Sequence, residues 1–161
     1  MGDPLPPRYH FAMSHTYTRQ LLHIVFSTKE RRPLLVPETR PRMFGYLRAV
    51  SADLGVAVLR INGVEDHVHL LVDMPASLST SEYLQKLKAN SSRWFRRQFQ
   101  QVDFHWQRGY GAFSVSESKV DDVSGYIDRQ EAHHKKSSFE EEIRKLVKSH
   151  GLEFDERFFL G

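Results

Sequence analysis

Two histidines separated by one apolar residue are the side chains of this sequence best suited to chemistry. His67 and His69 lie in the segment 66–74, where apolar residues occupy alternate positions. This period of two predicts a β-strand with a buried face. Both imidazoles would then point to the same side, roughly 6.5–7 Å apart along the strand. Two imidazoles at that separation can bind one cation, so the segment predicts half of a metal site that needs a further ligand.

A second group of chemically capable side chains lies on a helix predicted from about 118 to 134. At about 3.6 residues per turn, Tyr126, Gln130 and His133 fall within roughly 60° of one another on the helix surface. Tyr126 and Gln130 are four residues apart and therefore point the same way. A phenol beside an amide oxygen is typical of a nucleophile next to a metal ligand. His133 and His134 are expected to be surface residues near the helix C-terminus, where the helix dipole favours them.

The elements that must position these groups follow from the hydrophobic pattern. Strands are predicted at about 18–29, 56–61, 66–74, 104–106 and 112–115, and helices at about 37–54, 80–99, 118–134 and 139–150. Asn62-Gly63 is a hairpin-turn signal, and Ser79 with Glu82 forms a capping box before the second helix. The order β-α-β-β-α-β, followed by helices, predicts an α+β, ferredoxin-like (RRM-like) antiparallel sheet with helices on one face and a C-terminal tyrosine-bearing helix.

Taken together, the motifs resemble a known family. His67-Val68-His69 after a hairpin is similar to the His-hydrophobe-His motif of HUH endonucleases. The helix with Tyr126, Gln130 and the following His-His pair resembles the tyrosine helix of single-tyrosine HUH transposases, the TnpA-type enzymes of small insertion sequences and their REP-associated relatives. The segments 23–35 and 105–111 also look typical of this group, and the resemblance covers about 14–134.

The resemblance implies a site and a reaction. His67 and His69 would bind a divalent metal ion, Gln130 would complete the site, and Tyr126 would be the nucleophile. The expected ion is Mg²⁺ or Mn²⁺, although such ligands would also accept Zn²⁺ or Ni²⁺. Attack on a phosphodiester of single-stranded DNA would give a 5′-phosphotyrosine and a free 3′-hydroxyl. The 3′-hydroxyl of a second strand could then attack the phosphotyrosine and reverse the step. The family implies hairpin-forming element ends as partner, and a homodimer with shared active sites.

Basic side chains are the expected contacts to DNA phosphates. They are Lys86, Lys88, Arg93, Arg96, Arg97, Lys119 and Arg129. Trp106 and Tyr110 could stack on bases if they are exposed, although packing in the core is the more common role of such residues.

The composition limits the class of protein and the kinds of site that this chain can form. The chain has 161 residues, a net charge of +3 and no cysteine, so it has neither disulfides nor a thiolate metal site. We expect a Pro-rich leader at 1–13, with Met13 as an alternative start, and one domain at 14–161. No signal peptide or membrane span is evident, so a cytoplasmic location is expected.

Two other functions are compatible with parts of the pattern. A non-catalytic single-stranded nucleic-acid-binding module would share the fold but carry aromatic residues on its central strands, where this chain has His67 and His69. A His-x-His metallohydrolase would activate water and make Tyr126 dispensable. A domesticated host protein with the same nicking chemistry is a further variant of the transposase hypothesis.

Overall fold

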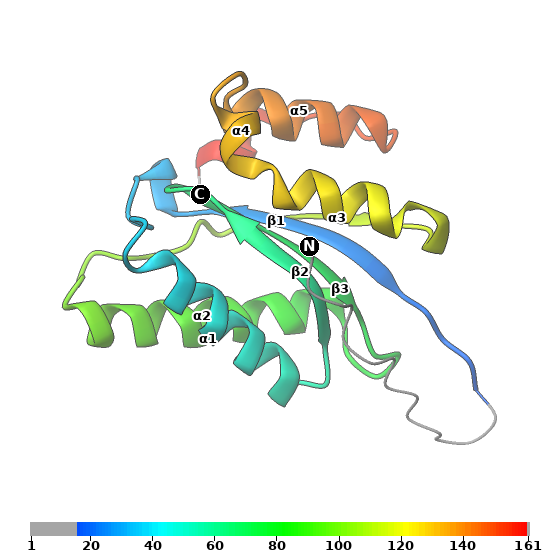
Figure 1. Cartoon of the computed structure of the whole chain (residues 1–161), viewed down its shortest axis with the longest axis horizontal. Helices are drawn as coiled ribbons and strands as arrows, with labels where there is room; N and C mark the ends of the chain where they lie inside the picture. Colours follow the sequence, from blue (N-terminus) through cyan, green and yellow to red (C-terminus); the bar gives the residue numbers. More distant parts are fainter. Residues whose placement is uncertain (1–15, 161) are drawn as a thin grey trace.

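A four-stranded antiparallel sheet forms the centre of the molecule (Figure 1). The computed structural model describes residues 16–160, so the predicted leader 1–13 and Met13 lie outside it. The strands are β1 (Leu21–Ser27), β2 (Ala57–Gly63), β3 (His67–Asp73) and β4 (Gly111–Ser114). Their spatial order is β2-β3-β1-β4, and every neighbouring pair is antiparallel. The α+β, ferredoxin-like prediction is confirmed, with β3 in the interior of the sheet.

Helices cover both faces of this sheet. They are α1 (Arg40–Asp53), α2 (Thr80–Phe99), α3 (Val120–Asp128), α4 (Gln130–His134) and α5 (Phe139–Ser149), with short 3-10 helices at Lys29–Arg31, Glu117–Lys119 and Glu156–Leu160. The α1 and α2 helices pack on one face, while α3, α4 and α5 lie across the other (Figure 1). No helix within residues 16–160 is both long and apolar enough to cross a membrane.

The alternation along β3 sorts its side chains between the two faces. Val68, Leu70 and Val72 belong to the large core beneath α1 and α2. Leu71 belongs to a second core that includes Ile127 of α3. Since side chains alternate along a strand, His67 and His69 share the face of Leu71, which α3 to α5 cover.

The β2–β3 hairpin is confirmed, but the predicted turn is wrong. Asn62 and Gly63 are the last residues of β2, opposite His69 and Val68, and the chain reverses at 64–66. A Cβ atom on Gly63 would lie 2.3 Å from the carbonyl oxygen of His67, so glycine permits a close approach of the two strands. The Asn62 amide donates to the carbonyl oxygens of Ile127 (2.9 Å) and Asp128 (3.3 Å). It thereby holds the end of α3 on the sheet.

The strand predicted at 104–106 is also wrong. Trp106 makes only an isolated bridge to Thr28. Its ring is buried edge-on against Phe26, and its indole N–H donates to Ser91 Oγ at 2.9 Å. Trp106 is thus a core residue rather than an exposed base-stacking one.

The helix predicted at 118–134 is interrupted. It consists of a 3-10 turn, α3 and α4, with Arg129 (φ −98°, ψ 21°) between the last two. The Arg129 guanidinium lies over Gly125, where it would be 2.8 Å from an added Cβ. Gly125 therefore makes room for this side chain, and the break allows Tyr126 and Gln130 to lie on separate helices.

Candidate metal centre and nucleophile

His67 and His69 form the floor of a buried polar site. Both side chains are fully buried, and their ring centroids are 5.2 Å apart. His67 Nδ1 lies 2.6 Å from the Asp66 carboxylate, and His69 Nδ1 lies 2.8 Å from His23 Nε2. Because each Nδ1 atom already has a partner, each Nε2 atom is left to face the site. This arrangement is typical of metal-binding histidines, whose second nitrogen is held by a carboxylate or another polar group.

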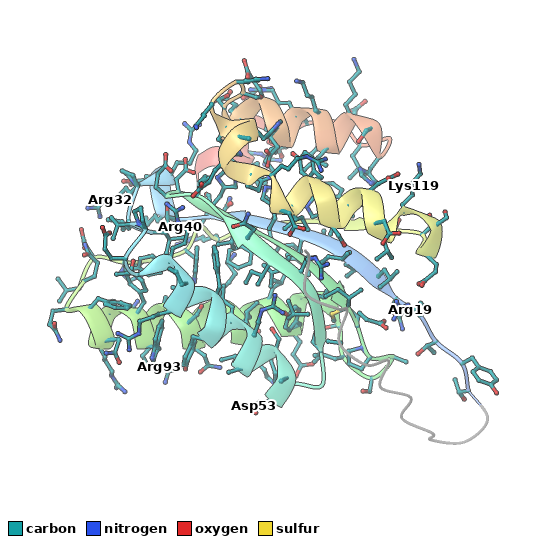
Figure 2. The ribbon with its side chains drawn as sticks, viewed as in Figure 1. Arg19, Arg32, Arg40, Asp53, Arg93 and Lys119 are labelled. Carbon is teal, nitrogen blue, oxygen red and sulfur yellow. The ribbon has the colours of Figure 1, made fainter. Side chains whose placement is uncertain are left out.

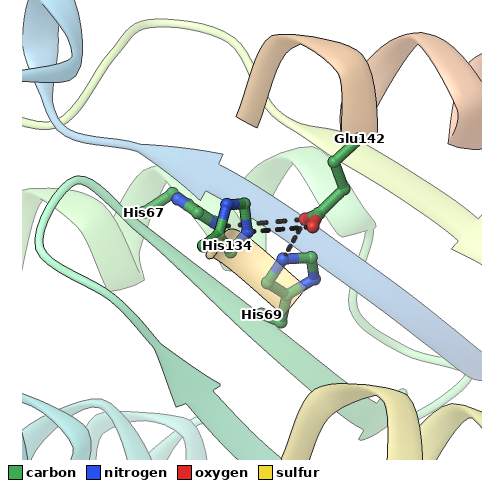
Figure 3. A group of neighbouring side chains, drawn as sticks. All are labelled: His67, His69, His134 and Glu142. Atoms are coloured by element: carbon green, nitrogen blue, oxygen red, sulfur yellow. Dashed lines mark ion pairs between the residues drawn. The ribbon is translucent and has the colours of Figure 1, made fainter. Parts of the chain in front are cut away.

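A carboxylate from α5 reaches into the same site (Figure 3). Glu142 Oε1 lies 2.5 Å from His69 Nε2 and 3.7 Å from His67 Nε2. Glu142 Oε2 lies 2.9 Å from Nε2 of both His133 and His134. The side chain of Glu142 is only 1% exposed. One ligand atom each from His67, His69, His134 and Glu142 fall within 4.8 Å of one another.

The buried polar atoms of this group fit a bound cation. Both carboxylate oxygens of Glu142, His69 Nε2 and His133 Nε2 have no hydrogen-bond partner among residues 16–160, despite their close approach. Buried polar groups are normally hydrogen-bonded, and leaving them unsatisfied is costly. Imidazole nitrogens and a carboxylate are also the usual ligands of divalent transition metals. The residues present therefore suit the metal ion that the sequence predicts.

The structure brings the other two predicted site residues to this group. Gln130, the first residue of α4, is fully buried. Its Oε1 lies 3.4 Å from His67 Nε2 and 3.0 Å from His134 Nε2. Tyr126 on α3 is half-buried, with its ring centroid 5.8 Å from that of His69. All of these residues belong to one chain, so their juxtaposition does not require a partner subunit.

Burial and charge set the protonation of the site. Burial lowers the pKa of His69 to about 4 and that of His23 to about 3, so both imidazoles are neutral at pH 7. Burial, and then the negative charge of Glu142, raise the pKa of Tyr126. Burial alone would raise the pKa of Glu142, but the imidazoles of His134 and His69 outweigh it and lower that pKa. The site thus combines one carboxylate with a phenol that is reluctant to ionise.

A cavity of about 510 Å³ opens beside Tyr126. His23, Lys119 and His150 are among the residues that line it. It lies between the end of β4, the start of α3 and the end of α5, and it gives a ligand access to the tyrosine.

The predicted DNA-binding residues divide between the two faces of the sheet. Lys119 and Arg129 are exposed on the α3 side. The other five, Lys86, Lys88, Arg93, Arg96 and Arg97, lie on α2, across the sheet from His67 and His69. Figure 2 shows Arg93 and Lys119 on opposite sides of the molecule. Four of the five have partners within the chain. Lys88 donates to the carbonyl oxygens of Arg108 and Gly109, and Arg96 donates to that of Phe104. Lys86 pairs with Glu82, and Arg93 donates to Asn90 Oδ1.

Sequence reasoning missed the contribution of α5. The surface assignment of His133 and His134 is wrong, because both contact the buried Glu142. A signal for Glu142 was present, since it lies between Phe139 and Ile143 on the buried face of an amphipathic helix. A charged residue on such a face needs a partner. Three consecutive glutamates at 140–142 conceal that signal in the sequence.

Comparisons with known proteins identify the family of this chain. The family described as "Transposase IS200 like" matches residues 16–130. The transposase for insertion sequence element IS200 of Salmonella typhimurium is 30% identical over 125 residues, covering 74% of this chain and 82% of its own.

Two solved structures share the fold. A candidate transposase from Deinococcus radiodurans R1 has a TM-score of 0.62 and 22% identity, covering 73% of this chain and 95% of its own. A REP-associated tyrosine transposase bound to a REP hairpin has a TM-score of 0.53 and 13% identity, covering 77% of this chain and 72% of its own. With a family match over most of its length, this chain belongs to the IS200-like transposases.

Proposed function

We propose that the chain cuts and rejoins single-stranded DNA with Tyr126 as nucleophile and a divalent cation held by His67, His69 and Gln130. The observation that carries this proposal is the position of Tyr126 beside the buried His69, which neighbours the buried His67. The Nδ1 atom of each histidine already has a partner. A bound cation would polarise the scissile phosphate and lower the pKa of Tyr126. Without such positive charge, burial and Glu142 keep the pKa of Tyr126 high.

The step is a transesterification. Tyr126 Oη attacks the phosphorus, an O–P bond forms to the tyrosine, and the bond from phosphorus to the 3′ oxygen breaks. The proton that Tyr126 loses is balanced by one that the departing 3′ oxygen gains. The product is a 5′-phosphotyrosine with a free 3′-hydroxyl, and attack by a second 3′-hydroxyl reverses the step onto another strand. The number of phosphoester bonds is conserved, so the reaction needs no ATP.

The cavity beside Tyr126 is the proposed seat of the scissile nucleotide. Lys119 lines it and supplies a positive charge for a phosphate. The five basic residues of α2 lie on the other face of the sheet and cannot contact the same phosphate as Lys119. We assign them to a more distant part of the DNA. The structural neighbour bound to a REP hairpin supports a hairpin near the cleavage site as that distant part.

The rival functions are less compatible with the structure. A nucleic-acid-binding module of the RNA-recognition type needs an open sheet face, but here α3 to α5 cover the face that carries His67 and His69 (Figure 1). A metallohydrolase would use the same histidines, so only the role of Tyr126 separates it from a transposase. The predicted homodimer stays a prediction.

The test is detection of the covalent intermediate. The chain would be incubated with single-stranded DNA libraries and Mn²⁺, and the products analysed by denaturing gel and mass spectrometry. We expect an adduct on Tyr126 that is absent in Tyr126→Phe and His67→Ala and retained in Tyr17→Phe, since Tyr17 is 96% exposed. Cleavage that survives Tyr126→Phe would contradict the proposal and identify a water-activating hydrolase.

A further inference from the structure

We propose that α5 supplies a metal ligand, Glu142, which together with His67, His69 and His134 allows this chain to hold its cation before DNA arrives. This inference rests on the proposed function, because it assumes a cation at His67 and His69. It goes beyond that function by assigning a carboxylate and a third imidazole to the site.

The Glu142 carboxylate lies where a ligand of a cation at His69 and His134 would lie. It lies 2.5 Å from His69 Nε2 and 2.9 Å from His134 Nε2. In a simple ion pair, an imidazole N–H would point at a carboxylate oxygen. Neither Glu142 oxygen has a hydrogen-bond partner among the described residues. Imidazole nitrogens and carboxylate oxygens that converge this closely in a buried site are the arrangement expected of ligands around a cation.

The α5 helix holds this carboxylate in place. Ser138 and Glu141 form a complete capping box at its N-terminus. Phe139 is buried and stacks on the His67 ring, with centroids 4.3 Å apart, and Ile143 is fully buried. Glu142 is thus fixed by a cap and by apolar contacts on both sides of it along the helix.

The Glu142 carboxylate and the third imidazole lie in the part of the chain beyond the family match. The match to the IS200-like family ends at residue 130. His134 and Glu142 both follow that point. The family match therefore covers the other predicted ligands, His67, His69 and Gln130, but includes neither His134 nor the carboxylate.

The ligand set also indicates the class of metal. Three imidazoles and one carboxylate suit Zn²⁺, Mn²⁺ and similar transition ions, whereas Mg²⁺ prefers oxygen ligands and retains much of its water. We therefore expect the chain to bind a transition metal in preference to Mg²⁺.

The experiment measures metal affinity without DNA or turnover. The whole, metal-free chain would be titrated with Zn²⁺ in competition with a chromophoric chelator. We expect one ion per chain, and at least a tenfold loss of affinity in Glu142→Gln, because even residues that only support a ligand cost about 10–100-fold. Glu140→Gln is the matched control, since Glu140 lies on the same helix but pairs with Arg144 and Arg31. Its affinity should equal that of the wild type.

The outcomes separate this inference from the proposed function. Equal affinities of Glu142→Gln and wild type, with loss in His67→Ala, would overturn the role of Glu142 and leave the metal site intact. No Zn²⁺ binding by the wild type without DNA would overturn this inference, whereas absence of the Tyr126 adduct with Mn²⁺ and DNA would overturn the proposed function. If Glu142→Gln does not fold by circular dichroism, anomalous diffraction from Zn²⁺-soaked wild-type crystals decides. An ion about 2.0–2.2 Å from a Glu142 oxygen supports the inference, and an ion at His67 and His69 with Glu142 turned away refutes it.

Discussion

His23 Nε2 lies 2.8 Å from His69 Nδ1, a hydrogen bond between adjacent antiparallel strands inside the buried site. For His69 to bind a metal through Nε2, its Nδ1 must carry the proton and donate it to His23. Burial lowers the pKa of His23 to about 3, so His23 is neutral and able to accept. His23 therefore fixes both the tautomer and the orientation of His69.

Replacing His23 should weaken metal binding without removing a ligand. We expect His23→Phe to lower the affinity for Zn²⁺ about 10–100-fold, because it removes the partner of a metal-binding histidine. Competition with a chelator measures this. His150→Phe is the control, since His150 lines the same cavity but stacks on Phe113. An unchanged affinity of His23→Phe would show that His69 needs no orienting partner.

Short single strands should depend on Lys119 rather than on α2. Lys119→Ala should weaken binding of a short oligonucleotide and reduce its salt slope by about 0.7, the value for one phosphate contact on a single strand. Arg93→Ala combined with Arg97→Ala should leave this binding unchanged, because these residues lie across the sheet. The same double variant should weaken a longer, hairpin-bearing DNA. Fluorescence anisotropy at several salt concentrations tests both statements. Equal losses of affinity for the short oligonucleotide in the Lys119 variant and the double variant would contradict the separate roles of Lys119 and α2.

A mixing experiment decides whether active sites are shared. Within one chain, Tyr126 lies beside His69 and His69 lies beside His67. Unlike the shared sites that the family resemblance implies, this arrangement leads us to expect no covalent DNA adduct from a mixture of Tyr126→Phe and His67→Ala proteins. A shared site in a homodimer would instead restore adduct formation, since one mixed site would contain both native residues. Mass spectrometry of the mixture distinguishes the two results.

Gly63 and Gly45 should respond oppositely to alanine. A Cβ on Gly63 meets the His67 carbonyl oxygen at 2.3 Å, so Gly63→Ala should lower the free energy of unfolding by about 1–3 kcal/mol through overpacking. Gly45 lies within α1 with nothing within 4 Å of an added Cβ. Gly45→Ala should therefore raise the free energy of unfolding by about 0.5–1 kcal/mol. Urea denaturation measures both, and a neutral Gly63→Ala would show that the strands can separate without cost.

Lys88 predicts an increase in stability with pH. Burial lowers its pKa from 10.5 to about 8. Below the pKa of Lys88 in the folded protein, Lys88 is protonated in both the folded and the unfolded state. The folded state then bears the full cost of burying the charge. Between about pH 8 and 10.5 the unfolded state binds more protons than the folded state, so stability rises through this window.

The matched variant isolates this effect. Relative to Lys88→Met, the wild-type free energy of unfolding should rise by about 1–3 kcal/mol between pH 7.5 and 10.5. Urea denaturation of both proteins across this range measures it. A difference that stays constant or falls would show that Lys88 remains charged, held by the carbonyl oxygens of Arg108 and Gly109.

The sheet was predictable because its signals are local. The alternation in 66–74 requires one buried face, and this places His67 and His69 together whatever surrounds them. The helices α1, α2 and α5 have apolar stripes and end signals, such as Gly55 with φ 76° after α1 and the Ser79 cap of α2. These signals do not depend on distant contacts.

The errors arise where a distant contact decides the structure. The dipeptide Asn62-Gly63 is a turn signal by itself. In the structure, the Asn62 amide instead donates to carbonyl oxygens at the end of α3, and Asn62 remains in strand β2. The helix break at Arg129 and the burial of Glu142 likewise depend on elements that meet only in three dimensions. Periodicity shows that a residue is buried, and it does not show what lies opposite.

The distance along the chain between His69 and Glu142 has a consequence for biosynthesis. Its codon follows that of His69 by 142 − 69 = 73 residues, which a ribosome adds in roughly 4–15 s at about 5–20 residues per second. During that interval the emerging chain carries the strand histidines and, later, the tyrosine, but not the carboxylate that packs against them. The complete polar cluster forms only after α5 has been translated, so the strand histidines leave the ribosome well before the carboxylate that packs against them.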